Sequence, residues 1–192
     1  MKTEEFWAGK FGIEYLQRNQ INPDDRVPFW KSAVDYCTPA SVLEVGCNRG
    51  HNLVAIQKCD ASIDCYGVDV NAVAVEEARQ QGLEVQRANG QSIAGLYEAG
   101  SMDLVFTAGV LIHIPPEDLE AVMRAIIVTS ARYVLAIEYA GEKEEEIEYR
   151  GHAGKLWRRP FGNIYQDLGL KMLSYGEAGG FDQCIYWLLE KA

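Results

Sequence analysis

The stretch Ser41-Val-Leu-Glu-Val-Gly-Cys-Asn-Arg-Gly-His-Asn52 decides the fold of this chain. A short apolar run ends in a turn with two glycines, and residues that favour a helix follow the turn. A second apolar segment, Tyr66-Gly-Val-Asp-Val-Asn71, ends in the carboxylate of Asp69, 23 residues beyond Gly46. An acidic side chain at the end of a second strand accepts hydrogen bonds from ribose hydroxyls, so this pattern predicts a nucleoside-binding βαβ unit.

The spacing of the first turn separates it from two common phosphate-binding turns. A dinucleotide turn reads G-x-G-x-x-G and packs a pyrophosphate on a helix N-terminus. Here the spacing is Glu44-x-Gly46-x-Asn48-x-Gly50, and no G-K-[S/T] of a phosphate loop follows it. A carboxylate at the start of the turn repels a pyrophosphate but suits a ligand that carries an ammonium and a sulfonium.

These two segments resemble motifs I and II of the class I S-adenosylmethionine (SAM) methyltransferases. The resemblance implies SAM as the cofactor. It also implies that the first turn binds SAM through Glu44, Gly46, Cys47 and Asn48, and that the second strand does so through Asp69 and Val70. A glycine turn of some other α/β protein and a NAD-linked oxidoreductase, which uses the same βαβ geometry, remain the alternatives.

Strand and helix patterns alternate along the chain and then end in a hairpin. Strands are expected near 41–46, 63–69, 84–88, 102–108 and 132–138, with helices near 27–36, 51–59, 71–80 and 116–130 between them. Strand patterns at 170–177 and 182–189 meet at Gly179-Gly180. The fold class is therefore α/β: a doubly wound, Rossmann-like seven-stranded sheet, mostly parallel, with an antiparallel C-terminal hairpin strand.

Length and composition favour one domain that takes a small substrate. The chain has 192 residues, 48% of them hydrophobic, which suits a single SAM-dependent methyltransferase domain over 1–192. We divide it into an N-terminal helical lid (1–40), a cofactor-binding core (41–138), and a substrate loop with the terminal hairpin (139–192). The formal net charge of −10 argues against a nucleic-acid partner, and Lys155, Arg158 and Arg159 are the candidates for a local basic patch.

Cysteine usage and hydropathy point to the cytoplasm. The five cysteines form no C-x-x-C pair, which predicts reduced thiols and no metal site. The first residues lead into no apolar stretch, and no run of about 18 apolar residues occurs, so we expect neither a signal peptide nor a membrane span. The pattern leaves the oligomeric state open.

Further ligand-facing residues are expected where the later strands end, because open parallel sheets bind ligands there. In the resembled family the position of Asn89 recognises adenine, with Gly90 and Gln91 beside it. Thr107 and Gly109 follow the fourth strand and resemble motif IV, which implies contact with the cofactor. His113 either lines the methyl-transfer pocket or is a structural histidine.

Two aromatic segments extend the resemblance. The N-terminal run Glu5-Phe-Trp-Ala-Gly-Lys-Phe-Gly-Ile-Glu-Tyr15 and the later Tyr149-Arg-Gly-His152 are similar to methylases associated with pseudaminic acid biosynthesis. That resemblance implies that Trp7 and Tyr15 fold over the cofactor as a lid. It also implies sugar biosynthesis as the setting, with a nucleotide-linked or amino sugar as the small-molecule acceptor.

The acceptor side is expected to hold the residues that bind substrate and move a proton. Substrate-binding candidates are Tyr139, Tyr149, Arg150 and Trp157. If the acceptor is a hydroxyl or an ammonium, a base must remove a proton, and the candidates are His113, Glu138 and His152. A non-catalytic SAM-binding regulatory module is the alternative to a methyltransferase.

Overall fold

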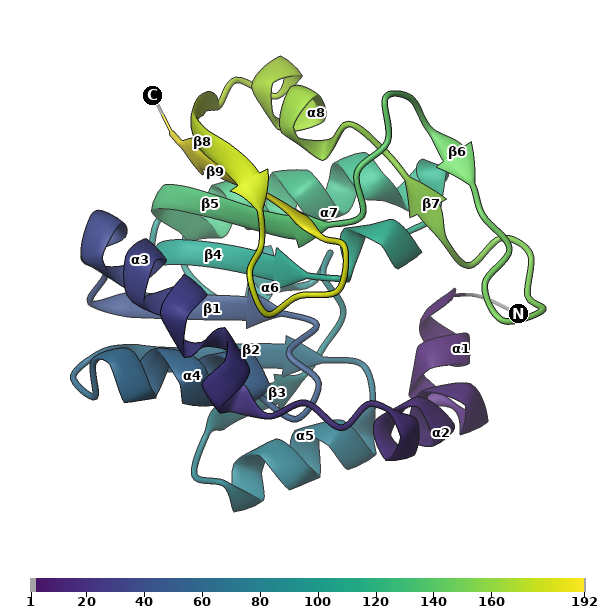
Figure 1. The fold of residues 1–192 in the computed structure, drawn as a ribbon, viewed down its shortest axis with the longest axis horizontal. Helices are drawn as coiled ribbons and strands as arrows, with labels where there is room; N and C mark the ends of the chain where they lie inside the picture. Colours follow the sequence, from purple (N-terminus) through teal and green to yellow (C-terminus); the bar gives the residue numbers. More distant parts are fainter. Residues whose placement is uncertain (1–2, 192) are drawn as a thin grey trace.

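One seven-stranded sheet organises the chain in the computed structural model, which describes residues 3–191 (Figure 1). Its strand order is β3-β2-β1-β4-β5-β9-β8, and β6 and β7 form a separate two-stranded arm. The strands are β1 (Ser41–Val45), β2 (Asp64–Asp69), β3 (Glu84–Arg87), β4 (Met102–Ala108), β5 (Ser130–Glu138), β6 (Glu145–Glu146), β7 (Trp157–Arg158), β8 (Lys171–Glu177) and β9 (Ile185–Glu190). The α-helices are α1 (Thr3–Ala8), α2 (Lys10–Arg18), α3 (Val27–Cys37), α4 (His51–Cys59), α5 (Ala72–Gln80), α6 (Ile93–Leu96), α7 (Pro116–Thr129) and α8 (Phe161–Asp167), with 3-10 turns η1 (Pro23–Arg26) and η2 (Leu111–His113).

Strands β1 to β5 pair in parallel, as their alternation with helices predicted. Strand β9 is the exception, because it lies antiparallel between β5 and β8. The predicted seven-stranded, mostly parallel sheet with an antiparallel hairpin strand is therefore confirmed. The strand order reverses between β1 and β4, and a crevice opens at such a switch point beyond the carboxyl ends of the strands.

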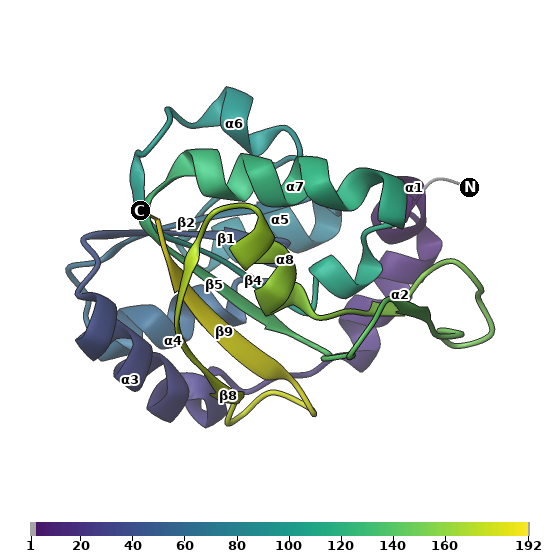
Figure 2. The same cartoon turned by 90° about the horizontal axis from the view of Figure 1, so that it is seen from above.

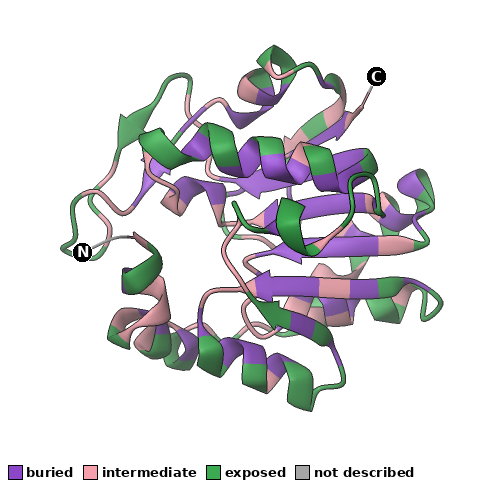
Figure 3. Ribbon diagram, turned by 180° about the vertical axis from the view of Figure 1, so that it is seen from behind, coloured by how far each residue is buried: buried purple, intermediate pink, exposed green. Residues whose placement is uncertain are grey.

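Alternate residues of each central strand enter two different cores, so both faces of the sheet are covered. On one face Val42, Leu104 and Phe106 pack against α3 and α4. On the other face Leu43, Val45 and Val105 pack against α7 and α8. The view from above shows α3 and α4 on one side of the sheet and α7 and α8 on the other (Figure 2). The strands are buried and the outer helix faces are exposed (Figure 3).

The N-terminal helical segment is broken at Gly9 into α1 and α2, and glycine is a weak helix former. The α5 helix begins after Asn71, whose side-chain Oδ1 accepts a hydrogen bond from the amide of Val73 at 3.0 Å. The arm formed by β6 and β7 was not predicted, because its strands have two residues each, one in an acidic run and the other in a basic, aromatic segment. No helix within residues 3–191 has the length and apolar character needed to cross a membrane.

The carboxylate of Glu138, at the end of β5, holds the turn that follows β4. Glu138 is fully buried. Its Oε1 accepts hydrogen bonds from the amides of Val110 (3.2 Å) and Leu111 (3.1 Å), and its Oε2 accepts one from Ile112 (3.3 Å). Burial raises the pKa of Glu138 to about 7, although these three amides partly offset that rise. The side chain therefore positions the loop that carries His113.

Replacing Glu138 by Gln is expected to change how stability depends on pH. The folded-state pKa of about 7 lies above the ordinary value of 4.5, so the stabilising contribution of this carboxyl is complete below pH 4.5 and is lost as pH rises through 7. The difference in unfolding free energy between native protein and Glu138→Gln should shift by about 2–3 kcal/mol between pH 4.5 and 7.5. Urea unfolding at several pH values measures it, and a constant difference would contradict the assignment.

Candidate functional site

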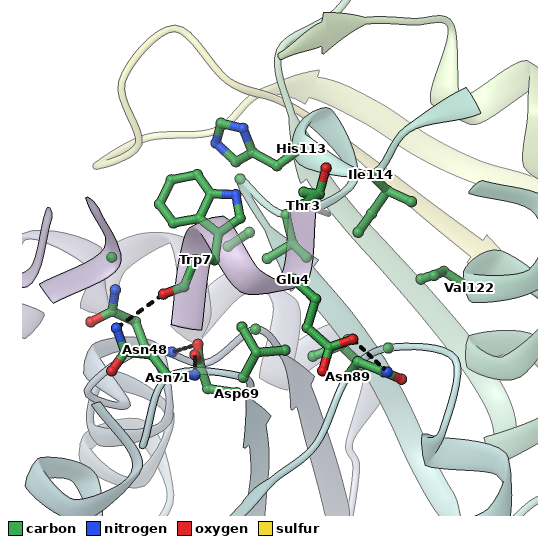
Figure 4. Close-up of a pocket in the computed structure, with 18 of the residues that line it drawn as sticks. Thr3, Glu4, Trp7, Asn48, Asp69, Asn71, Asn89, His113, Ile114 and Val122 are labelled. Atoms are coloured by element: carbon green, nitrogen blue, oxygen red, sulfur yellow. Dashed lines mark hydrogen bonds between the residues drawn. The ribbon is translucent and has the colours of Figure 1, made fainter. Parts of the chain in front are cut away.

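A cavity of about 900 Å³ opens at the carboxyl ends of β1, β2 and β4. The loops after these strands form the floor of the cavity, and residues of α1 and α2 line its opposite side. In Figure 1 the arrowheads of the central strands point toward α1 and α2. The volume is near the upper end of small-molecule sites, which gives room for a cofactor and a second ligand. Figure 4 shows its lining, with Asp69 and Asn89 on one side and Trp7 and His113 on the other.

Asp69 joins the two turns of the βαβ unit. One carboxylate oxygen, Oδ2, accepts a hydrogen bond from the amide of Asn48 at 2.8 Å, and the other, Oδ1, accepts one from Asn71 at 2.8 Å (Figure 4). Burial raises the pKa of Asp69, and these amide hydrogen bonds oppose the rise. Each carboxylate oxygen accepts more than one hydrogen bond, so Asp69 retains capacity for ligand hydroxyls.

Glu44, near the end of β1, is a buried carboxylate with one oxygen left open. Its Oε1 accepts a 2.6 Å hydrogen bond from Asn52 Nδ2, while its Oε2 is buried without a partner in the described chain. The Asn52 oxygen accepts from Arg26 Nη1 (2.8 Å) and Trp30 Nε1 (3.2 Å), which directs the Asn52 amino group toward Glu44. Burial raises the pKa of Glu44 to about 8. A cationic ligand group beside Glu44 would favour the ionised carboxylate and so lower this pKa.

The loop after β3 brings three predicted residues, Asn89, Gly90 and Gln91, to the cavity. Asn89 Nδ2 donates to Glu4 of the lid helix at 3.1 Å, and Gln91 Nε2 donates to Asp118 at 3.2 Å. A Cβ atom on Gly90 would lie 2.9 Å from a Val122 methyl carbon. A larger residue at this position would therefore have to displace the Val122 side chain.

Helices α1 and α2 close the cavity. The Asn71 side chain donates to the backbone carbonyl of Trp7 at 3.1 Å, and the Tyr15 ring lies 5.3 Å from the Trp7 ring. Gly12 permits this approach, because a Cβ there would lie 1.8 Å from the Trp7 carbonyl oxygen and 2.8 Å from Asn71 Nδ2. Trp7 and Tyr15 both line the cavity.

His113 lines the cavity from the η2 turn. Its Nδ1 lies 2.6 Å from the backbone carbonyl of Lys155. Burial lowers its pKa to about 4, so the imidazole is neutral at pH 7. Because a carbonyl only accepts, Nδ1 carries the single proton and Nε2 keeps a lone pair. The ring lies 4.5 Å from the Trp7 ring and 5.0 Å from the Tyr149 ring.

The arm and the loop between its strands pack against the lid. The His152 ring lies 5.0 Å from Phe6 and 5.4 Å from Phe11, and Tyr149 lies 6.1 Å from Trp7. Lys155 Nζ donates to Thr3 Oγ1 at 3.3 Å. The two aromatic segments that are far apart in the sequence therefore meet over the cavity.

Arg159 connects the arm to the η2 turn. Its guanidinium is fully buried, donates to the carbonyls of Leu111 (3.1 Å) and Ile114 (2.9 Å), and pairs with Glu144 at 2.7 Å. Because it is buried, Arg159 cannot belong to the surface basic patch for which the sequence made it a candidate. Glu138 holds the amides of this turn and Arg159 holds its carbonyls.

Several predicted residues lie outside the cavity lining. Glu138 is a correction, because its carboxylate is buried and engaged by three amides. His152 is a second correction, since it is exposed, packs against the Phe6 ring and is not part of the cavity lining. Thr107 is buried behind the cavity floor. The substrate-binding candidates outside the lining are Tyr139, Tyr149 and Arg150, whereas Trp157 lines the cavity.

The remaining predicted cofactor residues all line the cavity: Trp7, Tyr15, Glu44, Gly46, Cys47, Asn48, Asp69, Val70, Asn89, Gly90, Gln91 and Gly109. Sequence reasoning missed Arg26, His51, Asn52 and Lys155, which line it as well. His51 and Asn52 stand inside the quoted first motif and were available from it. Arg26 is brought there by η1, and Lys155 by the arm, so only the fold reveals them.

The comparisons with known proteins agree with this geometry. Residues 42–129 match the family described as "Methyltransferase domain". No curated protein sequence matches the chain. Across the residues that the structure describes, no group of three or more His, Cys, Asp or Glu side chains is arranged to hold a metal ion.

Solved structures share the whole fold at low sequence identity. Magnesium protoporphyrin IX methyltransferase from Synechocystis PCC 6803 with bound SAM has a TM-score of 0.72 and 15% identity, covering 100% of this chain and 98% of that one. The 1,6-didemethyltoxoflavin-N1-methyltransferase of Burkholderia thailandensis has a TM-score of 0.71 and 12% identity, with 88% and 80% covered. A SAM-dependent methyltransferase from Aquifex aeolicus has a TM-score of 0.64 and 17% identity, with 95% and 100% covered.

These likenesses establish the fold. The family match over residues 42–129 indicates a methyltransferase domain. The same match favours SAM over a nicotinamide as the cofactor. Residues 42–129 therefore match a methyltransferase domain, within a chain that shares the fold of SAM-dependent methyltransferases.

Proposed function

We propose that the protein transfers the methyl group of SAM to a small-molecule acceptor held between the lid, the η2 turn and the arm. The observation that carries this proposal is one continuous cavity. It joins the Asp69 and Glu44 carboxylates at the sheet to Trp7, His113 and Trp157 at the lid and arm. Bound SAM supplies an activated methyl group on a sulfonium, and the residues of the chain bind, orient and shield the reactants.

The cavity residues fit the parts of SAM. Asp69 stands at the end of β2, where a carboxylate accepts from ribose hydroxyls. Asn89 offers an amide that both donates and accepts, which suits the adenine edge. The open Glu44 Oε2 suits the ammonium of the methionine part, and the nearby Arg26 guanidinium suits its carboxylate.

Placement of the reactants is the main catalytic contribution that we assign to the chain. Holding two reactants in line can lower a barrier by about 7–11 kcal/mol in well-oriented systems. The lid aromatics Trp7 and Tyr15 exclude water, which favours a reaction in which the sulfonium charge is lost. Among the three base candidates, His113 is the one that lines the cavity. It can accept a proton because Nε2 carries the lone pair of the neutral ring.

A nucleotide-linked or amino sugar remains our candidate acceptor, in a sugar-biosynthetic and cytoplasmic setting. It rests on the resemblance of two aromatic segments to sugar-pathway methylases, and these segments meet at the Trp7–Tyr149 contact above the cavity. Incubation of the full chain with SAM and a panel of such sugars should release S-adenosylhomocysteine. Release with non-sugar acceptors alone would reject the sugar class while leaving methyl transfer intact.

Replacing Asp69 by Ala is expected to weaken SAM binding by about 1.5–3 kcal/mol, because hydrogen bonds to a charged group are lost. Isothermal titration calorimetry measures the affinity. Asp64→Ala is the matched control, since Asp64 begins the same strand and is exposed. Equal SAM affinity in native protein and Asp69→Ala would count against the ribose assignment.

Replacing Gly12 by Ala is expected to displace the lid, because the new methyl group would overlap the Trp7 carbonyl. The closed lid should lose about 1–3 kcal/mol, seen as weaker SAM binding with a nearly unchanged melting temperature. Gly95→Ala is the control, since a Cβ at Gly95 in α6 meets open space. If both variants bind SAM as the native protein does, α1 and α2 do not close over the cofactor.

A further inference from the structure

Two rings at the proposed acceptor end of the cavity carry hydrogen-bonding atoms that have no partner among residues 3–191. The Trp7 indole and the His113 imidazole both line the cavity, with centroids 4.5 Å apart. Figure 4 shows the two rings next to one another, across the cavity from Asp69 and Asn89. One ring comes from the lid and the other from the η2 turn, so closing the lid creates the pair.

The indole supplies a donor. Trp7 Nε1 is buried and has no hydrogen-bond acceptor within the described chain. An indole nitrogen can only donate, and buried donors are almost always paired. Tyr15, Phe11 and Phe6 surround this indole with ring contacts, which offer aromatic edges and no strong acceptor. The missing partner is therefore expected from a bound molecule.

The imidazole supplies an acceptor. The Lys155 carbonyl fixes the proton on Nδ1, so Nε2 presents a lone pair. The described chain provides no hydrogen bond to that nitrogen. A single oxygen atom that donates to His113 Nε2 and accepts from Trp7 Nε1 would satisfy both rings, whose centroids lie 4.5 Å apart.

We propose that the methyl acceptor of this enzyme is a hydroxyl group, bound between Trp7 Nε1–H and His113 Nε2. This inference rests on the proposed function and names the substrate class for it. A neutral amine can donate to the imidazole, but its single lone pair must attack the methyl carbon and so cannot also accept from the indole. A carboxylate or ether oxygen only accepts and leaves the imidazole lone pair unpaired. A hydroxyl meets both requirements at once.

The proton balance follows from the same pair. The hydroxyl oxygen forms a bond to the methyl carbon, and the carbon–sulfur bond breaks with its electron pair remaining on sulfur, which leaves as a neutral thioether. The hydroxyl proton passes to His113 Nε2. Trp7 donates to the other lone pair of the oxygen and keeps it oriented. Trp7 is in this account a specificity-determining residue.

Nuclear magnetic resonance can test this binding without turnover. The full chain, saturated with S-adenosylhomocysteine and carrying ¹⁵N-labelled tryptophan, is titrated with three probes of similar shape: benzyl alcohol, benzyl methyl ether and ethylbenzene. The alcohol donates and accepts, the ether only accepts, and the hydrocarbon does neither. The alcohol should bind more tightly than the ether, and the ether more tightly than ethylbenzene, each by roughly two- to tenfold. The Trp7 indole N–H signal should shift with the two oxygen-containing probes.

Variants show which ring is responsible for each affinity difference between the probes. Trp7→Phe should reduce the ether to the affinity of ethylbenzene, and His113→Phe should reduce the alcohol to that of the ether. Trp187→Phe, which alters an indole in β9 outside the cavity lining, should keep the order. A melting curve for each variant confirms that it is folded. His113→Gln supplies a second test if His113→Phe fails to fold.

Equal binding of the three probes, or binding that leaves the Trp7 signal unmoved, would overturn the hydroxyl assignment. Absence of any probe binding would overturn it as well. Calorimetry with S-adenosylhomocysteine separates this failure from a failure of the proposed function. If that ligand binds and the order of the probes is absent, only the acceptor class is wrong. If that ligand does not bind, the methyltransferase proposal itself fails.

Discussion

The carboxylate of Asp69 is the constraint on which the cofactor site depends. It accepts amide hydrogen bonds from Asn48, in the turn after β1, and from Asn71, in the turn after β2. Two loops that end neighbouring parallel strands are thereby fixed relative to one another. Asn71 then extends the connection, since it begins α5 through its side-chain oxygen and holds the lid through the Trp7 carbonyl. A single acidic residue thus links the sheet to the helices that cover it.

A second pair of buried charges sets the acceptor end. Glu138 engages the amides of the η2 turn, and Arg159 engages two of its carbonyls. Burying a charge costs free energy unless the charge is hydrogen-bonded. Moving either side chain away from the turn would remove its hydrogen bonds, so both side chains are held in place. The turn, in return, has a fixed shape and presents His113 to the cavity. Because Glu138 comes from β5 and Arg159 follows β7, this arrangement connects the main sheet to the arm.

The sequence was most informative where local pattern and chemistry agree. The glycine turn after Val45, the acidic end of β2 and the break at Gly9 were all readable from residue type and spacing. Glu138 was misassigned, because a strand-end carboxylate looks the same whether it meets substrate or backbone amides. His152 was misassigned because only tertiary packing shows that its ring contacts Phe6 and does not line the cavity. Arg26 and the arm strands depend on long-range contacts that carry no periodic signal.

A crystal structure of the protein with S-adenosylhomocysteine bound is the most direct test of this account. We predict the ribose hydroxyls on the Asp69 carboxylate, the adenine beside Asn89, the methionine part between Glu44 and Arg26, and the sulfur directed toward Trp7 and His113. The central claim would be contradicted by the ligand bound outside this cavity, or by ribose hydroxyls that make no contact with Asp69.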